Sequence, residues 1–118
     1  MRSGPPCALL LSTLLFSACR SHLIDATIEN RTGAPVQLLE VDYPSASFGV
    51  DSLSAGGDFR YRFQVQGSGQ LKISYIAADR QPVQIAGPSL AEHQQGLLLI
   101  VLKPGGKAQF LPRLTPPA

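Results

Sequence analysis

The chain has 118 residues, with ten Lys and Arg against eight Asp and Glu, and a formal net charge of +2. This length predicts one small domain. A nearly balanced charge without a run of Lys and Arg argues against a protein that binds nucleic acid. Ten prolines and eleven glycines predict many turns rather than long helices.

The first 18 residues have the composition of a secretory signal peptide. Arg2 supplies a positive start, an apolar stretch runs from Ala8 to Phe16, and two small residues precede Cys19. The apolar stretch is shorter than the roughly 18 to 20 residues that span a bilayer. We therefore predict a signal peptide over residues 1–18.

The segment Leu15-Phe16-Ser17-Ala18-Cys19 resembles the lipobox of bacterial lipoproteins, although that family usually has Leu where this chain has Phe16. The resemblance implies that Cys19 is lipidated and begins the mature protein, and that residues 19–22 form a lipidated tether to the membrane. In bacteria that sort lipoproteins by the next position, Arg20 implies the outer membrane, facing the periplasm. The alternative is an ordinary cleaved signal peptide that ends near a cysteine.

Cysteine content then limits how the mature domain is held together. Cys7 lies inside the predicted signal peptide, which leaves Cys19 alone in the mature chain. Small exported domains often rely on disulfides. This one has no pair of cysteines, so its stability must come from packing.

The first half of the mature chain alternates like β-strands. Ile24, Ala26 and Ile28 share one face of a predicted strand. A second strand runs over residues 36–43, and the apolar positions change face within it, which predicts a β-bulge near Leu38 or Leu39. Residues 47–50 are predicted to form a short edge strand.

The clearest alternation follows Asp58. Four apolar side chains share one face of a predicted strand: Phe59, Tyr61, Phe63 and Val65. Arg60 and Arg62 share the opposite face and are expected to point outward. We expect this strand to be the centre of the core. We interpret residues 67–69 (Gly-Ser-Gly) as a tight hairpin turn. The expected hairpin partner contains Leu71, Ile73 and Tyr75.

The last third of the chain predicts three further strands and one helical turn. Residues 82–86 form a strand, and residues 90–95 a single helical turn capped by Ser89. The apolar run over residues 97–102 is predicted to be a strand covered on both faces. Residues 107–111 return as its hairpin partner, and residues 114–118 form a flexible tail.

These elements predict an all-β fold over residues 23–113. About seven to eight short strands without long helices indicate an antiparallel β-sandwich, immunoglobulin-like or transthyretin-like. Residues 28–33, 41–44 and 47–49 give the mature segment a loose resemblance to small uncharacterised bacterial lipoproteins. That resemblance implies no particular activity.

Catalytic and metal-binding patterns are not found in the sequence. His22 and His93 have no Cys, carboxylate or second His at metal-ligand spacing. No serine lies in a Gly-x-Ser-x-Gly motif. We therefore expect neither an enzyme nor a bound cofactor or metal, although carboxylates that only the fold brings together, such as Asp42 and Asp51, stay an open alternative.

Two groups of residues are candidates for binding. Tyr43 and Phe48 flank a predicted loop of small residues, the kind of loop that often carries binding on a rigid sandwich. Arg60 and Arg62, with Lys72 on the expected partner strand, form a predicted cationic strip. The alternatives are packing of the two aromatic side chains at the core edge, and a solvated strand face whose charges oppose aggregation.

The function expected from this sequence is that of a membrane-anchored, non-enzymatic lipoprotein of the cell envelope with an interaction or structural role. Its partners would be the membrane, through lipid on Cys19, and an envelope protein. The alternative is a binding module for a small ligand or an envelope glycan, acting through the loop from Tyr43 to Phe48.

Overall fold

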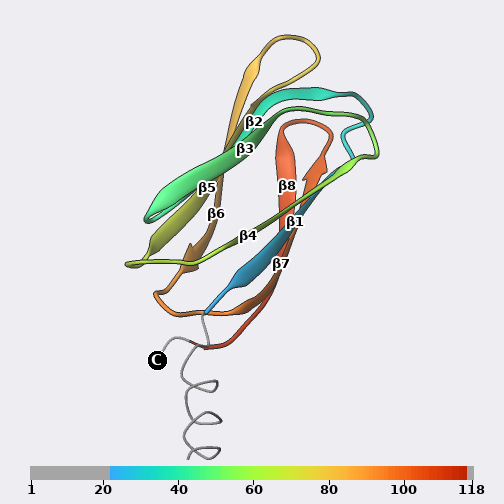
Figure 1. The fold of residues 1–118 in the computed structure, drawn as a ribbon. Helices are drawn as coiled ribbons and strands as arrows, with labels where there is room; N and C mark the ends of the chain where they lie inside the picture. The colour runs from blue at the N-terminus through green and yellow to red at the C-terminus, as the bar shows by residue number, and fades with distance from the viewer. Residues whose placement is uncertain (1–21, 117–118) are drawn as a thin grey trace, which may run out of the picture.

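The computed structural model describes residues 22–116, which contain eight strands and no helix (Figure 1). The strands are β1 (Ile24–Asn30), β2 (Val36–Tyr43), β3 (Ala46–Leu53), β4 (Asp58–Phe63), β5 (Gly69–Ile76), β6 (Pro82–Leu90), β7 (Gly96–Lys103) and β8 (Lys107–Leu114). The predicted signal peptide and Cys19 lie outside the described residues. Within residues 22–116 there is no helix of the length and apolarity that crossing a membrane requires.

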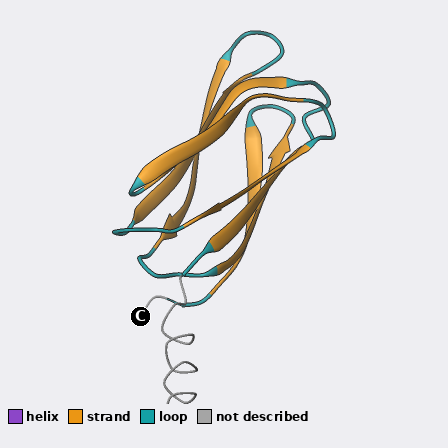
Figure 2. Ribbon diagram, in the orientation of Figure 1, coloured by secondary structure: helices purple, strands orange, loops and turns teal. Residues whose placement is uncertain are grey.

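The strands form two four-stranded sheets that pack face to face (Figure 2). Sheet A has the order β4-β1-β7-β8, and sheet B has the order β3-β2-β5-β6. Every pairing is antiparallel except that of β1 with β7, which is parallel. The predicted β-sandwich and its number of strands are confirmed.

The core consists of the inward side chains of both sheets. Alternate residues of β1, β2, β5 and β7 supply most of it, in agreement with their period-two pattern. The fully buried members include Ile24, Ile28, Val36, Leu39, Val41, Leu71, Ile73, Leu98, Ile100 and Leu102. Each such side chain stabilises the fold by about 1.5 to 3 kcal/mol through its transfer from water.

The predicted bulge in β2 is confirmed. The pairing of β2 with β5 shifts register between Gln37 and Glu40. Leu38 has a φ of 51° and is 64% exposed, whereas the next residue, Leu39, is buried. The extra residue lets β2 keep Val36 and Leu39 on the same inner face although they are three positions apart.

The predicted hairpin between β4 and β5 is wrong. β4 pairs with β1 in sheet A, and β5 pairs with β2 and β6 in sheet B. The segment after Phe63 crosses from one sheet to the other, with Val65 completely buried on the way. An alternating pattern reports which residues share a face but not which strand lies alongside, so Gly67 to Gly69 looked like a hairpin turn.

β4 is also not the centre of the core. It is an edge strand of sheet A, and only Phe63 of its three inward aromatic residues is buried. Phe59 is half-buried, and Tyr61 is 43% exposed. An edge strand has a neighbour on one side alone, so its inward side chains stay partly open to water.

The predicted helical turn at residues 90–95 is wrong. β6 continues through Ser89, which pairs with Gln70, to the buried Leu90. A tight turn follows, in which the N–H of Ala91 donates a 2.8 Å hydrogen bond to Oε1 of Gln94. Pairing within the sheet thus replaces the helix N-cap that Ser89 was expected to form.

The expectation that residues 97–102 are covered on both faces is wrong as well. Leu98, Ile100 and Leu102 are buried, but Leu97 is 54% exposed on the outer face of sheet A. Neighbouring β1 and β8 give Leu99 partial cover from the sides. The unbroken apolar run therefore reflects a central strand rather than a strand between two layers.

At the C-terminus, β8 extends to Leu114, beyond the predicted end of the strand at residue 111. Leu114 packs against the core, and the N–H of Thr115 donates a 2.9 Å hydrogen bond to the carbonyl oxygen of Gln95. Residues 114 and 115, expected in the flexible tail, are thus held by the domain.

Candidate functional site

The segment predicted to be a binding loop between Tyr43 and Phe48 is a tight β-hairpin. β2 ends at Tyr43, β3 begins at Ala46, and Asp42 pairs with Ser47. Phe48 lies within β3 and is only 7% exposed, and Tyr43 is half-buried. The structure brings the two rings together, with centroids 6.1 Å apart.

Both rings belong to an aromatic cluster between the edges of the two sheets. The rings of Tyr43 and Phe63 lie 4.4 Å apart, those of Phe48 and Phe63 5.5 Å, and those of Phe48 and Tyr61 4.3 Å. Burial raises the pKa of the Tyr43 hydroxyl. The cluster closes the sandwich where β3 lies over β4. This arrangement agrees with the alternative to a binding loop, in which Tyr43 and Phe48 pack at the edge of the core.

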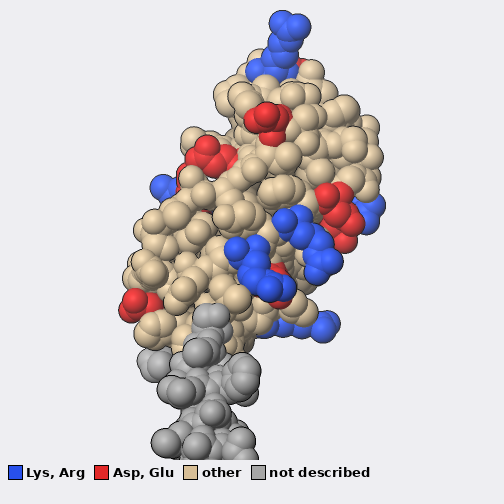
Figure 3. All heavy atoms as spheres, viewed as in Figure 1, with Lys and Arg blue, Asp and Glu red and all other residues tan. Residues whose placement is uncertain are grey.

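Arg60 and Arg62 point outward from β4, as the alternation predicted. Nε of Arg62 donates a 2.8 Å hydrogen bond to Oδ1 of Asp25 on the neighbouring β1, which raises the pKa of the guanidinium. Lys72 lies on β5 in the other sheet, so the predicted strip of three cations does not form. On the face seen in Figure 3, basic side chains gather near the middle with acidic ones around them.

The outer face of sheet B carries an acidic pair. Glu40 and Asp42 lie two residues apart on β2, and hydrogen bonding to Asp42, followed by charge repulsion, raises the pKa of Glu40. Asp42 pairs with Ser47 on β3, and Asp51 lies four residues further along that strand. The structure therefore does not bring Asp42 and Asp51 together. Among residues 22–116 no three His, Cys, Asp or Glu side chains are grouped to hold a metal ion.

The two histidines do meet, which their separation in the sequence did not indicate. The rings of His22 and His93 lie 5.0 Å apart, at the end of the sandwich where β1 begins. The turn before β7 places His93 there, with a φ of 71°.

The four edge strands differ in their protection against pairing with another chain. β4 carries Arg60 and Arg62, β6 carries two prolines, and β8 carries Lys107 and Pro112. β3 is an eight-residue edge strand that contains no Pro, Lys or Arg. Prolines and charged residues, Lys above all, are the usual means of blocking an exposed edge, and β3, with Asp51 as its one charged residue, is the least protected of the four edges.

The surface beside β3 is hollow and acidic. A shallow depression of about 320 Å³ runs along the β2–β3 pair and is lined by Leu38, Glu40, Ser47, Gly49 and Asp51, among others. A Cβ atom at Gly49 would lie 2.2 Å from the carbonyl oxygen of Leu39, so only glycine allows this close approach of the two backbones. The edge therefore offers unpaired backbone groups next to carboxylates.

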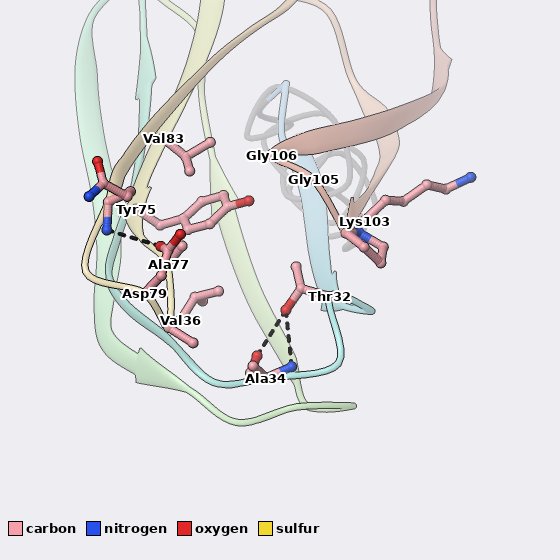
Figure 4. A pocket seen from close by; sticks show the side chains of 13 residues that line it. Thr32, Ala34, Val36, Tyr75, Ala77, Asp79, Val83, Lys103, Gly105 and Gly106 are labelled. Atoms are coloured by element: carbon pink, nitrogen blue, oxygen red, sulfur yellow. Dashed lines mark hydrogen bonds between the residues drawn. The ribbon is translucent and has the colours of Figure 1, made fainter.

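The β5–β6 and β7–β8 turns lie at the end of the sandwich opposite the start of β1 (Figure 1), and residues of these turns line a second hollow. This cavity has a volume of about 420 Å³ and lies between the β5–β6 turn and the β7–β8 turn (Figure 4). Thr32 forms part of its wall, and the Thr32 hydroxyl lies 2.8 Å from the carbonyl oxygen of Ala34. No sequence pattern indicated this cavity, because two turns more than 20 residues apart build it.

Comparison with known proteins adds information on the fold alone. No protein-family model matches the chain, and no curated protein is similar to it. A protein from Eubacterium rectale, solved by NMR, has a similar fold, with a TM-score of 0.55 and 11% sequence identity. The similarity covers 76% of this chain and 87% of the other.

Proposed function

We propose that this protein is a non-enzymatic lipoprotein of the cell envelope, anchored through lipid on Cys19, that binds an envelope protein by adding a strand to the edge of β3. The observation that carries the proposal is that the edge of β3 lacks Pro, Lys and Arg, at least one of which each of the other three edge strands holds. Strand addition uses backbone hydrogen bonds for affinity and alternate side chains for specificity.

The chemistry of the partner follows from the charges beside this edge. Glu40, Asp42 and Asp51 lie on the β2–β3 pair, and a hydrogen bond to Asp42, followed by repulsion from its negative charge, raises the pKa of Glu40. An extended segment with Lys or Arg at alternate positions would relieve this repulsion. The partner segment is therefore extended and basic.

The position of the domain relative to the membrane follows from the tether. Four residues separate Cys19 from Ile24, the first residue of β1. An extended chain covers at most about 3.3 to 3.6 Å per residue, so β1 would begin within roughly 20 Å of the lipid anchor. A lipoprotein with Arg20 after the cysteine would then present β3 in the periplasm beside the outer membrane.

The alternative, a module that binds a small ligand or envelope glycan through Tyr43 to Phe48, has less support. Phe48 is 7% exposed, and its ring is engaged by Tyr61 and Phe63. Little aromatic surface is left there for a sugar ring.

Two experiments test the proposal. In the native host, Cys19→Ser is expected to move the protein from the membrane fraction to the soluble fraction, because stable attachment needs the lipid. An unmodified, soluble mature N-terminus in the unsubstituted protein, detected by mass spectrometry, would contradict the anchor.

The second experiment is an NMR titration of the purified protein with an extended peptide that alternates Lys and Val. We expect the backbone amide signals of Ala46–Leu53 to shift, and the shifts to be lost in Ser47→Lys and Asp51→Lys. Gln109→Lys, which adds to β8 the single positive charge that Ser47→Lys adds to β3, is the matched control and should bind normally. Shifts confined to other strands, or equal binding by all three variants, would rule out the β3 edge.

A further inference from the structure

We infer that the cavity between the β5–β6 and β7–β8 turns is a binding site for a small neutral ligand with an apolar ring or chain and one hydroxyl or carbonyl group. The site is separate from the β3 edge and does not depend on lipidation of Cys19. It lies between two turns at the end of the sandwich opposite the start of β1 (Figure 1).

The cavity is open because of the turn that joins β7 to β8. Gly105 and Gly106 both have positive φ, 81° and 70°, and neither brings a side chain into the opening. A Cβ atom at Gly106 would already contact Val83 on β6, at 3.5 Å. Larger residues in this turn would narrow the gap between the two sheets.

The walls of the cavity are mainly apolar. Val36 and Tyr75 form its inner part and are 1% and 3% exposed, and Ala77 and Val83 line the side of β5 and β6. The volume of about 420 Å³ lies in the range of roughly 300 to 1,000 Å³ that is usual for ligand sites. These walls suit the apolar part of a ligand.

The hydroxyl of Tyr75 is the polar group inside the cavity. Tyr75 is only 3% exposed, yet its hydroxyl has no hydrogen-bond partner among residues 22–116. Every fully enclosed polar side-chain atom in this part of the chain has a partner, so the hydroxyl oxygen must keep some exposure to the cavity. Figure 4 shows it pointing from β5 across the cavity, toward Thr32 and the β7–β8 turn. The hydroxyl is therefore open to water in the cavity, and a ligand with a hydroxyl or carbonyl group would replace that water as its hydrogen-bond partner.

The charges around the mouth favour a neutral ligand. The side chain of Lys103 extends away from the cavity (Figure 4). Oδ1 of Asp79 accepts a 3.1 Å hydrogen bond from the N–H of Gln81 within the β5–β6 turn. The charge of Lys103 is therefore not directed at Tyr75, and burial raises the pKa of the Tyr75 hydroxyl, which stays neutral and able to donate.

The experiment is an NMR titration of the purified full chain with benzyl alcohol, compared with benzoate. We expect benzyl alcohol to shift the amide signals of Tyr75, Ala77, Val83 and Gly105, and benzoate to bind more weakly because its charge has no partner inside. Tyr75→Phe keeps the packing and removes the hydroxyl, so the affinity should fall about threefold to tenfold. Ala77→Leu fills the cavity and should abolish binding.

Tyr61→Phe is the matched control, because it removes a hydroxyl from an exposed tyrosine on β4 and should leave the affinity unchanged. Amide spectra of each variant in the absence of ligand report whether the fold is kept. The inference is overturned if benzyl alcohol leaves these four signals unmoved up to its solubility limit, if Tyr75→Phe binds as well as the unsubstituted protein, or if benzoate binds better than the alcohol.

Discussion

Phe48 of β3 and Tyr61 of β4 stack across the two sheets, with ring centroids 4.3 Å apart and planes 16° from parallel. The pair joins an edge strand of sheet B to an edge strand of sheet A. Stacked aromatic pairs contribute about 0.5 to 1.5 kcal/mol beyond the area that they bury. This contact holds the two sheets together on the side that carries the β3 edge.

Substitutions along β4 should separate the contributions of its two faces. Phe63→Ala removes a buried ring and is expected to lower the free energy of unfolding by about 3 to 5 kcal/mol. Tyr61→Ala should cost less, about 1 to 3 kcal/mol, because Tyr61 is 43% exposed and loses chiefly its contact with Phe48. Arg62→Ala, which breaks an exposed ion pair, should have the smallest effect. Urea unfolding measures all three, and equal losses for Phe63→Ala and Arg62→Ala would show that the faces of β4 are assigned wrongly.

Asn30 should be among the most sensitive polar residues. It is completely buried, and its side-chain N–H groups donate to the carbonyl oxygens of Ala34, Leu53 and Ser54 at 2.9, 3.0 and 3.2 Å. Asn30→Ala removes this donor from all three carbonyls and leaves Leu53 without a side-chain partner, while Ala34 keeps the Thr32 hydroxyl and Ser54 keeps the N–H of Gly57. The substitution is expected to cost about 1 to 3 kcal/mol.

Asn30→Asp should be worse at neutral pH, because a carboxylate would face three carbonyl oxygens. In this variant the folded state raises the carboxyl pKa above its unfolded value, since only the protonated form donates. The stability lost at neutral pH should therefore return as the pH falls below that raised pKa. Thermal unfolding over a range of pH measures this, and a stability that does not rise on acidification, relative to the unsubstituted protein, would contradict the assigned network.

Leu38 should be a position where glycine stabilises the protein. Its φ of 51° lies in the left-handed region, which costs a residue with a side chain about 1 to 2 kcal/mol, and its side chain is 64% exposed. We expect Leu38→Gly to raise the free energy of unfolding by about 1 kcal/mol. Leu97→Gly is the control, since Leu97 is also exposed but lies in a regular strand, where glycine should destabilise the fold. A loss of stability in both variants would exclude strain at Leu38.

The acidic pair on β2 predicts a dependence on pH. Because Asp42 raises the pKa of Glu40 in the folded state, the contribution of this pair to stability is present at pH below the unfolded pKa of Glu40 and is lost as the pH rises through the folded value. Asp42→Asn is expected to return the pKa of Glu40 toward its ordinary value. Side-chain carboxyl NMR measures the shift, and an unchanged Glu40 titration in this variant would refute the coupling.

How far the sequence predicts this fold depends on what each pattern reports. The apolar positions change face between Val36 and Val41, and this change located the bulge. A strand with one buried face can change the face of its apolar residues only by inserting an extra residue, which is a bulge. The partner of β4 was mistaken, because pairing depends on contacts between residues far apart in the chain. The alternation placed Tyr75 on an inner face correctly, yet the cavity at its hydroxyl arises from two distant turns and leaves no local pattern.

The parallel pairing of β1 with β7 has a consequence for the order of folding. Ile24 pairs with Gly96 and Asn30 with Leu102, so β1 pairs with a strand that begins more than 60 residues later in the chain. Loop closure over such distances slows folding. Sheet A cannot assemble completely on a nascent chain until β7 has emerged. A truncation that ends before Gly96 would leave β1 with β4 as its one neighbour and the inner face of sheet B uncovered, so such a fragment would be a target for proteases rather than a smaller working domain.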